Sequence, residues 1–159
     1  MTRSGRVVIA STRAAAGVYE DRCGPIIVDW LNARGISVPG ATVVPDGADV
    51  SRALFAAIGE NVDVVITSGG TGISPTDSTP EATADIVDYQ IPGLADAIRR
   101  SGLPHVPTSV LSRGVCGVRG RTLIVNLPGS TGGVKDGLGV LDDVLEHALD
   151  QLGGKDHTR

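Results

Sequence analysis

Residues 62–72 read Val-Asp-Val-Val-Ile-Thr-Ser-Gly-Gly-Thr-Gly, and this stretch decides the fold. Its first seven residues are rich in β-branched side chains, which predicts a buried strand. Three glycines follow, Gly69, Gly70 and Gly72, and they predict a loop whose backbone adopts positive φ and approaches a ligand closely. Successive N–H groups of such a loop can bind an anion. Taken alone, a glycine turn between a strand and a helix is equally typical of a structural connection.

After the loop, residues 77–82 read Asp-Ser-Thr-Pro-Glu-Ala and open a helix expected over residues 79–89. Ser78 and Glu81 have the spacing of a capping box. Asp77 can also cap this helix. Because Ser78 or Thr79 can already serve that purpose, we expect the Asp77 carboxylate to stay ionised just before the helix N-terminus. Beside an anion-binding loop, an ionised aspartate is a natural ligand for Mg²⁺.

Strand and helix patterns alternate along the rest of the chain. Strands are expected at residues 7–11, 37–44, 62–68, 115–118 and 121–127, and helices at residues 25–34, 49–58, 79–89, 94–101 and 133–152. Short connections between alternating elements predict an α/β fold, a three-layer α/β/α sandwich with a mostly parallel sheet. Arg119-Gly120 is expected to turn a two-residue hairpin, which adds one antiparallel strand. Ligands bind such sheets at the carboxyl ends of the strands.

Composition and charge exclude several classes of protein. The 159 residues are 41% hydrophobic and 20% charged, which fits one globular domain over residues 1–159 with a flexible tail at residues 153–159. The 22 glycines follow no G-x-y period, so they serve loops rather than a fibre. A formal net charge of −4 and only 3% aromatic residues argue against nucleic-acid binding.

The sequence also argues against a membrane protein. No apolar run approaches the ~18 residues that a membrane span needs, and the first residues do not form a signal peptide. Cys23 and Cys116 are too few for a disulfide framework or a zinc site, so we expect two small buried thiols. Together these features predict a protein of the reducing cytoplasm.

A second candidate carboxylate follows the second expected strand. Asp46 comes directly before Gly47, and this pair is also typical of an ordinary turn. Its place at the carboxyl end of a strand keeps a functional role open. Asp46 and Asp77 are therefore the candidate catalytic residues, and they are placed to share one divalent metal ion.

Other side chains and backbone groups at the same ends of strands are candidates for holding a phosphorylated ligand. A guanidinium can bind phosphate through two hydrogen bonds, and a helix N-terminus can bind an anion. The alternatives are solvated charges and capped turns. The candidate binding residues are Ser11, Arg13, Ser68, Gly69, Gly70, Thr71, Gly72, Ser78, Ser112, Arg113, Pro128, Gly129 and Ser130.

The two segments 67–72 and 77–82 together resemble the signature of molybdopterin-binding domains, in particular the bacterial Mog and MoaB proteins and the gephyrin N-terminal domain. Further segments fall in the family's order and extend the resemblance over nearly the whole chain. They are Arg13 with residues 17–21, Pro45-Asp46, and residues 91–93, 111–113 and 126–129. One departure is Ser11-Thr12-Arg13, where many relatives have Ser-Asp-Arg.

The resemblance implies a molybdopterin adenylyltransferase, which uses Mg-ATP to form adenylyl-molybdopterin and pyrophosphate. It assigns the family's two functional aspartates to Asp46 and Asp77 and its glycine loop to Gly69, Gly70 and Gly72. It also implies a homotrimer or a hexamer, and a separate molybdenum-insertion protein as partner. A non-catalytic molybdopterin-binding or carrier protein of the MoaB type is the alternative, and a nucleotide-binding regulatory protein is a third.

Overall fold

The computed structural model describes residues 2–155, and strand β4 (Val64–Ser68) lies at the centre of its sheet. All five residues of β4 are buried. β4 pairs in parallel with β1 (Arg3–Ala10) on one side and with β7 (Thr122–Leu127) on the other. Because both neighbours are hydrogen-bonded along its length, β4 is shielded from water at its edges as well as on its faces. The prediction of a buried strand before the glycine loop is confirmed.

The sheet is mostly parallel, with the strand order β2-β1-β4-β7-β6-β5. β2 (Ile36–Ser37) and β3 (Ala41–Val44) both pair in parallel with β1. β6 (Cys116–Arg119) is antiparallel to β7, and β5 (Tyr89–Gln90) is antiparallel to β6. Among the strands of the described residues, β6 alone therefore runs against the others. The predicted sheet, with one antiparallel strand, is confirmed.

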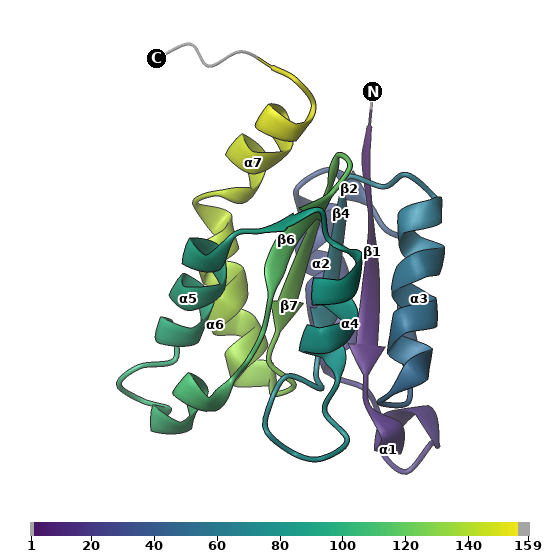
Figure 1. The fold of residues 1–159 in the computed structure, drawn as a ribbon, viewed down its shortest axis with the longest axis vertical. Helices are drawn as coiled ribbons and strands as arrows, with labels where there is room; N and C mark the ends of the chain where they lie inside the picture. Colours follow the sequence, from purple (N-terminus) through teal and green to yellow (C-terminus); the bar gives the residue numbers. More distant parts are fainter. Residues whose placement is uncertain (1, 156–159) are drawn as a thin grey trace.

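Helices cover both faces of the sheet (Figure 1). One face is covered by α2 (Cys23–Ala33), α5 (Pro92–Arg100), α6 (Thr131–Asp142) and α7 (Leu145–Leu152). The other is covered by α3 (Ala48–Gly59) and α4 (Thr79–Ile86). Successive residues of β1 divide between the two cores, since side chains alternate along a strand: Val7 and Ile9 face one core, Val8 and Ala10 the other. The three-layer sandwich is confirmed.

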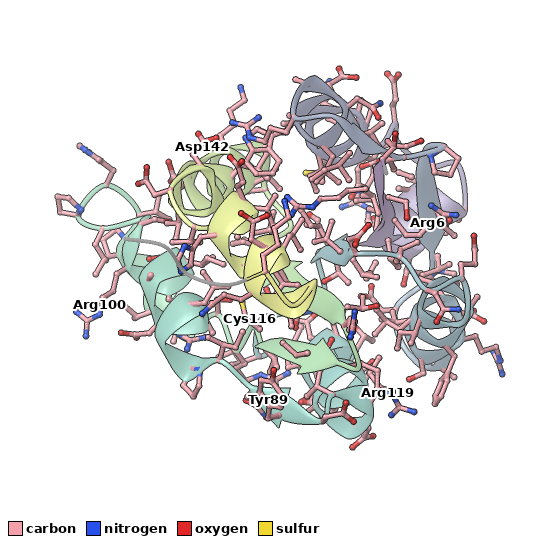
Figure 2. The ribbon with its side chains drawn as sticks, turned by 90° about the horizontal axis from the view of Figure 1, so that it is seen from above. Arg6, Tyr89, Arg100, Cys116, Arg119 and Asp142 are labelled. Carbon is pink, nitrogen blue, oxygen red and sulfur yellow. The ribbon has the colours of Figure 1, made fainter. Side chains whose placement is uncertain are left out.

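Within residues 2–155, the buried residues are mostly apolar, and the buried polar ones are uncharged. Figure 2 shows Cys116 toward the centre of the molecule, whereas Arg100 and Asp142 project from the periphery. Cys23 and Cys116 are both free and buried, as expected. Burial raises the pKa of the Cys116 thiol to about 12. In residues 2–155, no helix is long and apolar enough to cross a membrane.

Several element boundaries differ from the prediction. The strand expected at residues 37–44 is two strands, because Pro39 between them has no N–H for the ladder. The helix expected at residues 79–89 ends at Ile86, since Val87 takes an extended backbone and leads into β5. The hairpin turn is Gly120-Arg121, one residue later than expected, because Arg119 pairs with Thr122 in the sheet.

The C-terminal region also departs from the expected single helix over residues 133–152. It divides into α6 and α7, and short-range hydrogen bonds from the N–H groups of Asp143 and Val144 turn the chain between them. This turn lets Leu145 and Leu149 of α7 pack in the same core as α6. Of the tail expected at residues 153–159, Lys155 N donates to the Asp150 carbonyl, and residues 156–159 lie outside the described residues.

Besides β5, two short helices were not predicted, and both adjoin the carboxyl ends of the strands. α1 (Thr12–Ala15) follows β1 directly, and the 3₁₀ helix η1 (Pro107–Leu111) follows α5. Ser11 caps α1, since its Oγ accepts a hydrogen bond from Ala14 N at 3.2 Å. These elements complete the rim around the ends of the strands, where a ligand site is expected.

Candidate active site

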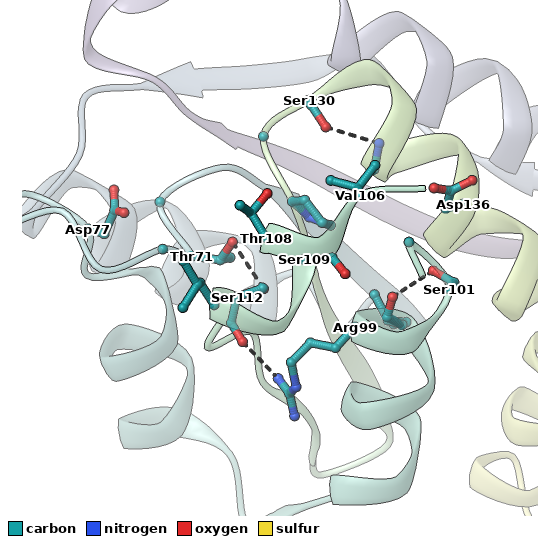
Figure 3. Close-up of a pocket in the computed structure, with 18 residues that line it drawn as sticks. Thr71, Asp77, Arg99, Ser101, Val106, Thr108, Ser109, Ser112, Ser130 and Asp136 are labelled. Carbon is teal, nitrogen blue, oxygen red and sulfur yellow. Dashed lines mark hydrogen bonds between the residues drawn. The ribbon is translucent and has the colours of Figure 1, made fainter. Parts of the chain in front are cut away.

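Two adjacent cavities open where β1, β3, β4 and β7 end. The large cavity, of about 700 Å³, lies between the loops after these strands. The small cavity, of about 370 Å³, lies between the glycine loop, η1 and the start of α6 (Figure 3). Gly70, Asp77 and Gly129 line both. The two cavities therefore adjoin at the glycine loop, where a group bound in one can contact a group bound in the other.

Most of the predicted binding residues line one cavity or the other. The large cavity takes in Ser11, Arg13, Asp46, Ser68 and Gly69; the small cavity takes in Thr71, Gly72, Ser112, Pro128 and Ser130. Both candidate carboxylates, Asp46 and Asp77, line the large cavity. Of the predicted residues, Ser78 and Arg113 line neither. The carboxyl ends of the strands thus bring the predicted residues together, with those two exceptions.

The glycine loop is packed too tightly to accept side chains. Gly69 and Gly70 have φ values of +92° and +67°, which L-residues rarely adopt. A Cβ on Gly69 would collide with the carbonyl oxygen of Ala10 at the end of β1. A Cβ on Gly129 would lie 3.3 Å from the Gly69 Cα, so the loop after β7 also rests on this backbone. Glycine is required here by close backbone contact between three neighbouring loops.

One carboxylate oxygen of Asp46, Oδ2, has a hydrogen-bond partner, and the other, Oδ1, has none. Thr12 Oγ1 donates to Asp46 Oδ2 at 3.0 Å and accepts from Asp46 N at 3.1 Å. Asp46 Oδ1 is buried and has no hydrogen-bond partner, and the same is true of Thr79 Oγ1. A Cβ on Gly70 would collide with Thr79 Oγ1 and lie 2.9 Å from Asp46 Oδ1. The two unsatisfied oxygens therefore face the same side of Gly70.

Asp77 turns its carboxylate back toward the glycine loop. Its Oδ2 accepts from Ser74 N at 3.3 Å and would lie 2.9 Å from a Cβ on Gly72. Figure 3 shows Asp77 at the rim of the small cavity. Because it lines both cavities, its carboxylate is available to a group bound in either.

The expected capping box of α4 is absent, so that prediction was wrong. Ser78 occupies the N-cap position, but its side chain makes no capping hydrogen bond. Glu81 instead accepts from Arg113 Nη1 at 2.6 Å. A charge-assisted hydrogen bond with Arg113, which is distant in sequence, thus replaces the expected bond to the Ser78 backbone. The Arg113 guanidinium lowers the pKa of Glu81 below its ordinary value.

Arg113 fixes the glycine loop from outside the cavities. Its Nε donates to the Gly72 carbonyl at 2.8 Å and its Nη2 to the Asp77 carbonyl at 3.2 Å. Its backbone N–H donates to the Thr71 carbonyl at 2.7 Å. With Glu81 on Nη1, each of the three guanidinium nitrogens donates to a protein group. In this arrangement Arg113 shapes the loop, and its guanidinium does not face the cavities.

Three of the serines predicted to bind a ligand also make side-chain hydrogen bonds within the protein. Ser68 Oγ donates to the Pro128 carbonyl at 2.7 Å, which joins the ends of β4 and β7. Ser130 Oγ caps α6 by accepting from Gly133 N at 3.0 Å. Ser112 Oγ lies 3.4 Å from Thr71 Oγ1 (Figure 3). Each hydroxyl is thereby oriented at the edge of a cavity.

Arg13 is the predicted cation that reaches the large cavity. Its guanidinium carbon lies 5.6 Å from the centre of the Tyr19 ring, within range of a cation–π contact. Tyr19 OH lies 2.8 Å from Ser11 Oγ, so the aromatic ring is itself oriented by the start of α1. Arg13 is exposed, which leaves its donors accessible to an anion in the cavity.

Sequence reasoning missed several residues that support the site, among them Asn126 and Arg99. Asn126, buried in β7, donates from Nδ2 to Thr67 Oγ1 and Thr83 Oγ1, both at 3.0 Å, and accepts from Val115 N at 3.0 Å. Arg99 of α5 lines the small cavity and donates to the Gly114 carbonyl at 2.9 Å. The sequence did carry a signal for Asn126, since it is an amide side chain inside a mostly apolar strand. No local pattern marks Arg99, because its partner lies on another element.

The charged groups allow only a limited kind of metal site. Within residues 2–155, no three His, Cys, Asp or Glu side chains are grouped so that they could hold a metal ion. Asp46 and Asp77 are two carboxylates lining one cavity, and Asp46 Oδ1 has no protein partner. Two carboxylates suit a Mg²⁺ ion that takes its other ligands from phosphate and water. The donor set thus fits an ion that enters with a phosphorylated ligand.

Residues 6–150 match the profile of a family described as a probable molybdopterin binding domain. The chain belongs to this family. The match covers all but the ends of the chain, and it confirms the resemblance indicated by the glycine loop and residues 77–82. The cavities at the carboxyl ends of the strands are therefore the candidate active site of a molybdopterin-binding domain.

Named relatives of this molybdopterin-binding domain include enzymes. It is 37% identical to the molybdopterin adenylyltransferase of Escherichia coli K12, over 90% of the chain and 77% of that protein. It is 38% identical to the molybdenum cofactor biosynthesis bifunctional protein of Synechococcus elongatus, over 95% of the chain and 48% of that protein. The chain spans about half the length of such bifunctional relatives.

Solved structures confirm the fold. The Mog protein from Mycobacterium ulcerans is 67% identical and superposes with a TM-score of 0.91, over 94% of this chain and 99% of that one. The MoaB protein from Thermus thermophilus is 40% identical with a TM-score of 0.87, over 99% of this chain and 100% of that one. The molybdopterin-binding domain therefore has the architecture of Mog and MoaB proteins.

Proposed function

We propose that this protein is a molybdopterin adenylyltransferase. It transfers the adenylyl group of Mg-ATP to the terminal phosphate of molybdopterin and releases pyrophosphate. The observation that carries the proposal is the placement of two carboxylates, Asp46 and Asp77, in one cavity beside a glycine loop, with a second cavity adjoining at Asp77. The similarity to named molybdopterin adenylyltransferases supports the same activity.

Charge explains why such a site requires a divalent cation. The charged side chains lining the large cavity are Arg13 and Arg22 against Glu20, Asp21, Asp46 and Asp77. A cavity with more carboxylates than guanidinium groups repels phosphate. Asp46 and Asp77 would hold Mg²⁺, which neutralises phosphate charge and stabilises the departing pyrophosphate when it is bound. The acidic side chains thus support binding of an anion instead of preventing it.

The protein's own groups orient the two substrates. Backbone N–H groups of the glycine loop can bind phosphate oxygens at the boundary of the cavities. One substrate in each cavity brings the two reacting phosphates together near Asp77, and such proximity supplies much of the rate of a reaction between two bound molecules. The transfer needs no covalent intermediate with the enzyme, because the molybdopterin phosphate attacks the α-phosphate directly.

The test is to measure adenylyl transfer by Asp77→Asn and Asp46→Ala. We expect each to lose about 100-fold or more in turnover, because each removes a charge that acts on the reacting phosphates. Asp49→Asn is the matched control, since Asp49 lies on α3 and lines neither cavity. Circular dichroism establishes that each variant is folded. Undiminished turnover by folded Asp46 and Asp77 variants would refute the assignment.

A non-catalytic molybdopterin-binding or carrier protein is the second candidate. The similarity of the fold to the Thermus thermophilus MoaB protein, which is described as a molybdopterin biosynthesis enzyme, does not separate the two candidates. Both candidates bind molybdopterin, so only the reaction separates them. Release of pyrophosphate from ATP when molybdopterin is added supports the transferase, and binding without release supports the carrier. Binding of ATP without any binding of molybdopterin would support a nucleotide-binding regulatory protein.

We propose that the protein acts as a homotrimer or hexamer in the cytoplasm and passes its product to a separate molybdenum-insertion protein. Three exposed large apolar side chains, Val106, Val110 and Leu111, lie in or directly beside the short helix η1 and support an association between copies. Two buried free thiols suit a reducing compartment. Sedimentation equilibrium measures the mass directly, and a mass of about 16 kDa would refute the oligomer.

A further inference from the structure

Thr12 and Asp46 are brought together by the register of the sheet. Thr12 follows β1 and Asp46 follows β3, and these two strands pair in parallel, with Ala10 opposite Val44. The N–H of Ser11 continues this ladder by donating to the Val44 carbonyl at 2.9 Å. Two loops that leave adjacent parallel strands at the same edge therefore start side by side. The contact between Thr12 and Asp46 is built into the sheet.

The chemistry of the pair fixes the direction of both hydrogen bonds. The backbone N–H of Asp46 can only donate, so Thr12 Oγ1 accepts there, at 3.1 Å. The hydroxyl proton is then free for Asp46 Oδ2, at 3.0 Å. One hydroxyl thereby fixes both the backbone and the side chain of Asp46. A β-branched residue suits this task, because its χ1 angle has few alternatives.

The consequence is an asymmetric carboxylate. Oδ2 is satisfied by Thr12, whereas Oδ1 is buried without a partner on the Gly70 side, near the equally unsatisfied Thr79 Oγ1. A buried carboxylate oxygen without a hydrogen-bond partner costs folding free energy. The rest of the structure must therefore impose the orientation that leaves Oδ1 without a partner. Thr12 is the residue that imposes it.

We propose that Thr12 is a positioning residue that presents a single oxygen of Asp46, Oδ1, to the divalent cation of a bound nucleotide. The inference rests on the proposed function, because that function gives Asp46 its cation. Hydrogen-bond partners of metal-binding carboxylates orient them, and removal of such a partner typically weakens metal binding about 10–100-fold. Thr12 lines the large cavity, and the role assigned to it here is exerted through its hydrogen bonds to Asp46.

The test compares Thr12→Val, which keeps the shape and removes the hydroxyl, with Thr12→Ser, which keeps the hydroxyl. Mn²⁺ is titrated into each protein with α,β-methylene-ATP, which cannot transfer its adenylyl group, and the free Mn²⁺ is followed by electron paramagnetic resonance. Thr42→Val is the matched control, since Thr42 is an exposed threonine of β3 that lines neither cavity. Circular dichroism and thermal melting confirm that all variants fold.

We expect Thr12→Val to raise the Kd of Mn²⁺ about tenfold or more, the equivalent of about 1.4 kcal/mol. Thr12→Ser and Thr42→Val should bind Mn²⁺ as the natural protein does. In steady-state adenylyl transfer, Thr12→Val should raise the Mg²⁺ concentration for half-maximal rate by the same factor. Its kcat at saturating Mg²⁺ should change little, because the cation then restores the orientation of Asp46.

Three results would overturn the inference. They are unchanged Mn²⁺ binding by Thr12→Val, binding by Thr12→Ser that is as weak as that of Thr12→Val, and no Mn²⁺ binding by the natural protein with the nucleotide analogue. If the natural protein binds Mn²⁺ but transfers no adenylyl group, the proposed function fails while the role of Thr12 is still decided by the binding titration. The two hypotheses are thus tested separately.

Discussion

Replacing Gly70 by alanine is expected to damage both the fold and the site, because two features of this position exclude a side chain. With φ at +67°, an L-residue costs about 1–2 kcal/mol relative to glycine. The new Cβ would also collide with Thr79 Oγ1 and lie 2.9 Å from Asp46 Oδ1. Forcing buried groups aside costs a further ~1–3 kcal/mol. The free energy of unfolding should therefore fall by about 2–5 kcal/mol.

Gly35→Ala separates these two contributions. Gly35 has φ +75°, close to that of Gly70, but a Cβ there would meet nothing within 4 Å. Its substitution therefore measures the backbone cost alone, and the extra destabilisation of Gly70→Ala measures the collision. In a chain of this length, each kcal/mol lowers the melting temperature by roughly 2–4 °C. Gly70→Ala should thus melt roughly 2–12 °C below Gly35→Ala.

The assay is urea unfolding of both variants, with binding of nucleotide and Mn²⁺ measured at a temperature where both are folded. Gly35→Ala should bind as the natural protein does, and Gly70→Ala should not, since its Cβ displaces Asp46 Oδ1. Equal urea midpoints for the two variants would refute the reasoning. They would mean that Thr79 and Asp46 move aside at no cost.

Two further predictions concern the support of the site and the acid stability of the fold. Asn126→Leu should lower the free energy of unfolding by about 3 kcal/mol or more, because Thr67, Thr83 and the Val115 N–H lose a buried partner; an unchanged urea midpoint would contradict this. Arg3 lowers the pKa of Asp150, so the pair stabilises the fold above the ordinary carboxyl pKa of 3.8, and the effect is lost as the pH falls below it. Arg3→Met should therefore melt slightly lower at pH 7 and no lower in strong acid, whereas a constant difference across this range would refute the assignment.

The parts of the fold that were predictable are those fixed by local pattern. β4 begins with three apolar β-branched residues, Val64, Val65 and Ile66, and its burial on both faces follows from that run. The break between α6 and α7 has no such signal, since Leu138, Leu141, Leu145 and Leu149 keep helical spacing through it and pack in one core. The strand β5 is only two residues long and is defined by its partner β6, so no local pattern could reveal it.

The candidate site divides in the same way. Asp46, Asp77 and the glycines were found because they follow strands directly, and the structure places them around one pair of cavities. Their catalytic roles stay predictions. The partners that orient them were not found, since Thr12 contacts Asp46 across 34 positions and Arg113 contacts Glu81 across 32. The capping-box prediction failed for this reason, because a local spacing cannot show that a distant arginine takes the glutamate.

The unsatisfied polar atoms of the molecule point to the same region. Within residues 2–155, three buried side-chain atoms have no hydrogen-bond partner: Asp46 Oδ1, Thr79 Oγ1 and Ser109 Oγ. The first two meet at Gly70, and Ser109 lines the small cavity. Each such atom costs about 1–3 kcal/mol of folding free energy. The fold avoids this cost at the buried Asn126, whose Nδ2 and Oδ1 both have hydrogen-bond partners. Proteins depart from good packing chiefly at functional sites. A bound cation or phosphate that reaches these atoms satisfies them, so ligand binding at the ends of the strands should stabilise the whole fold.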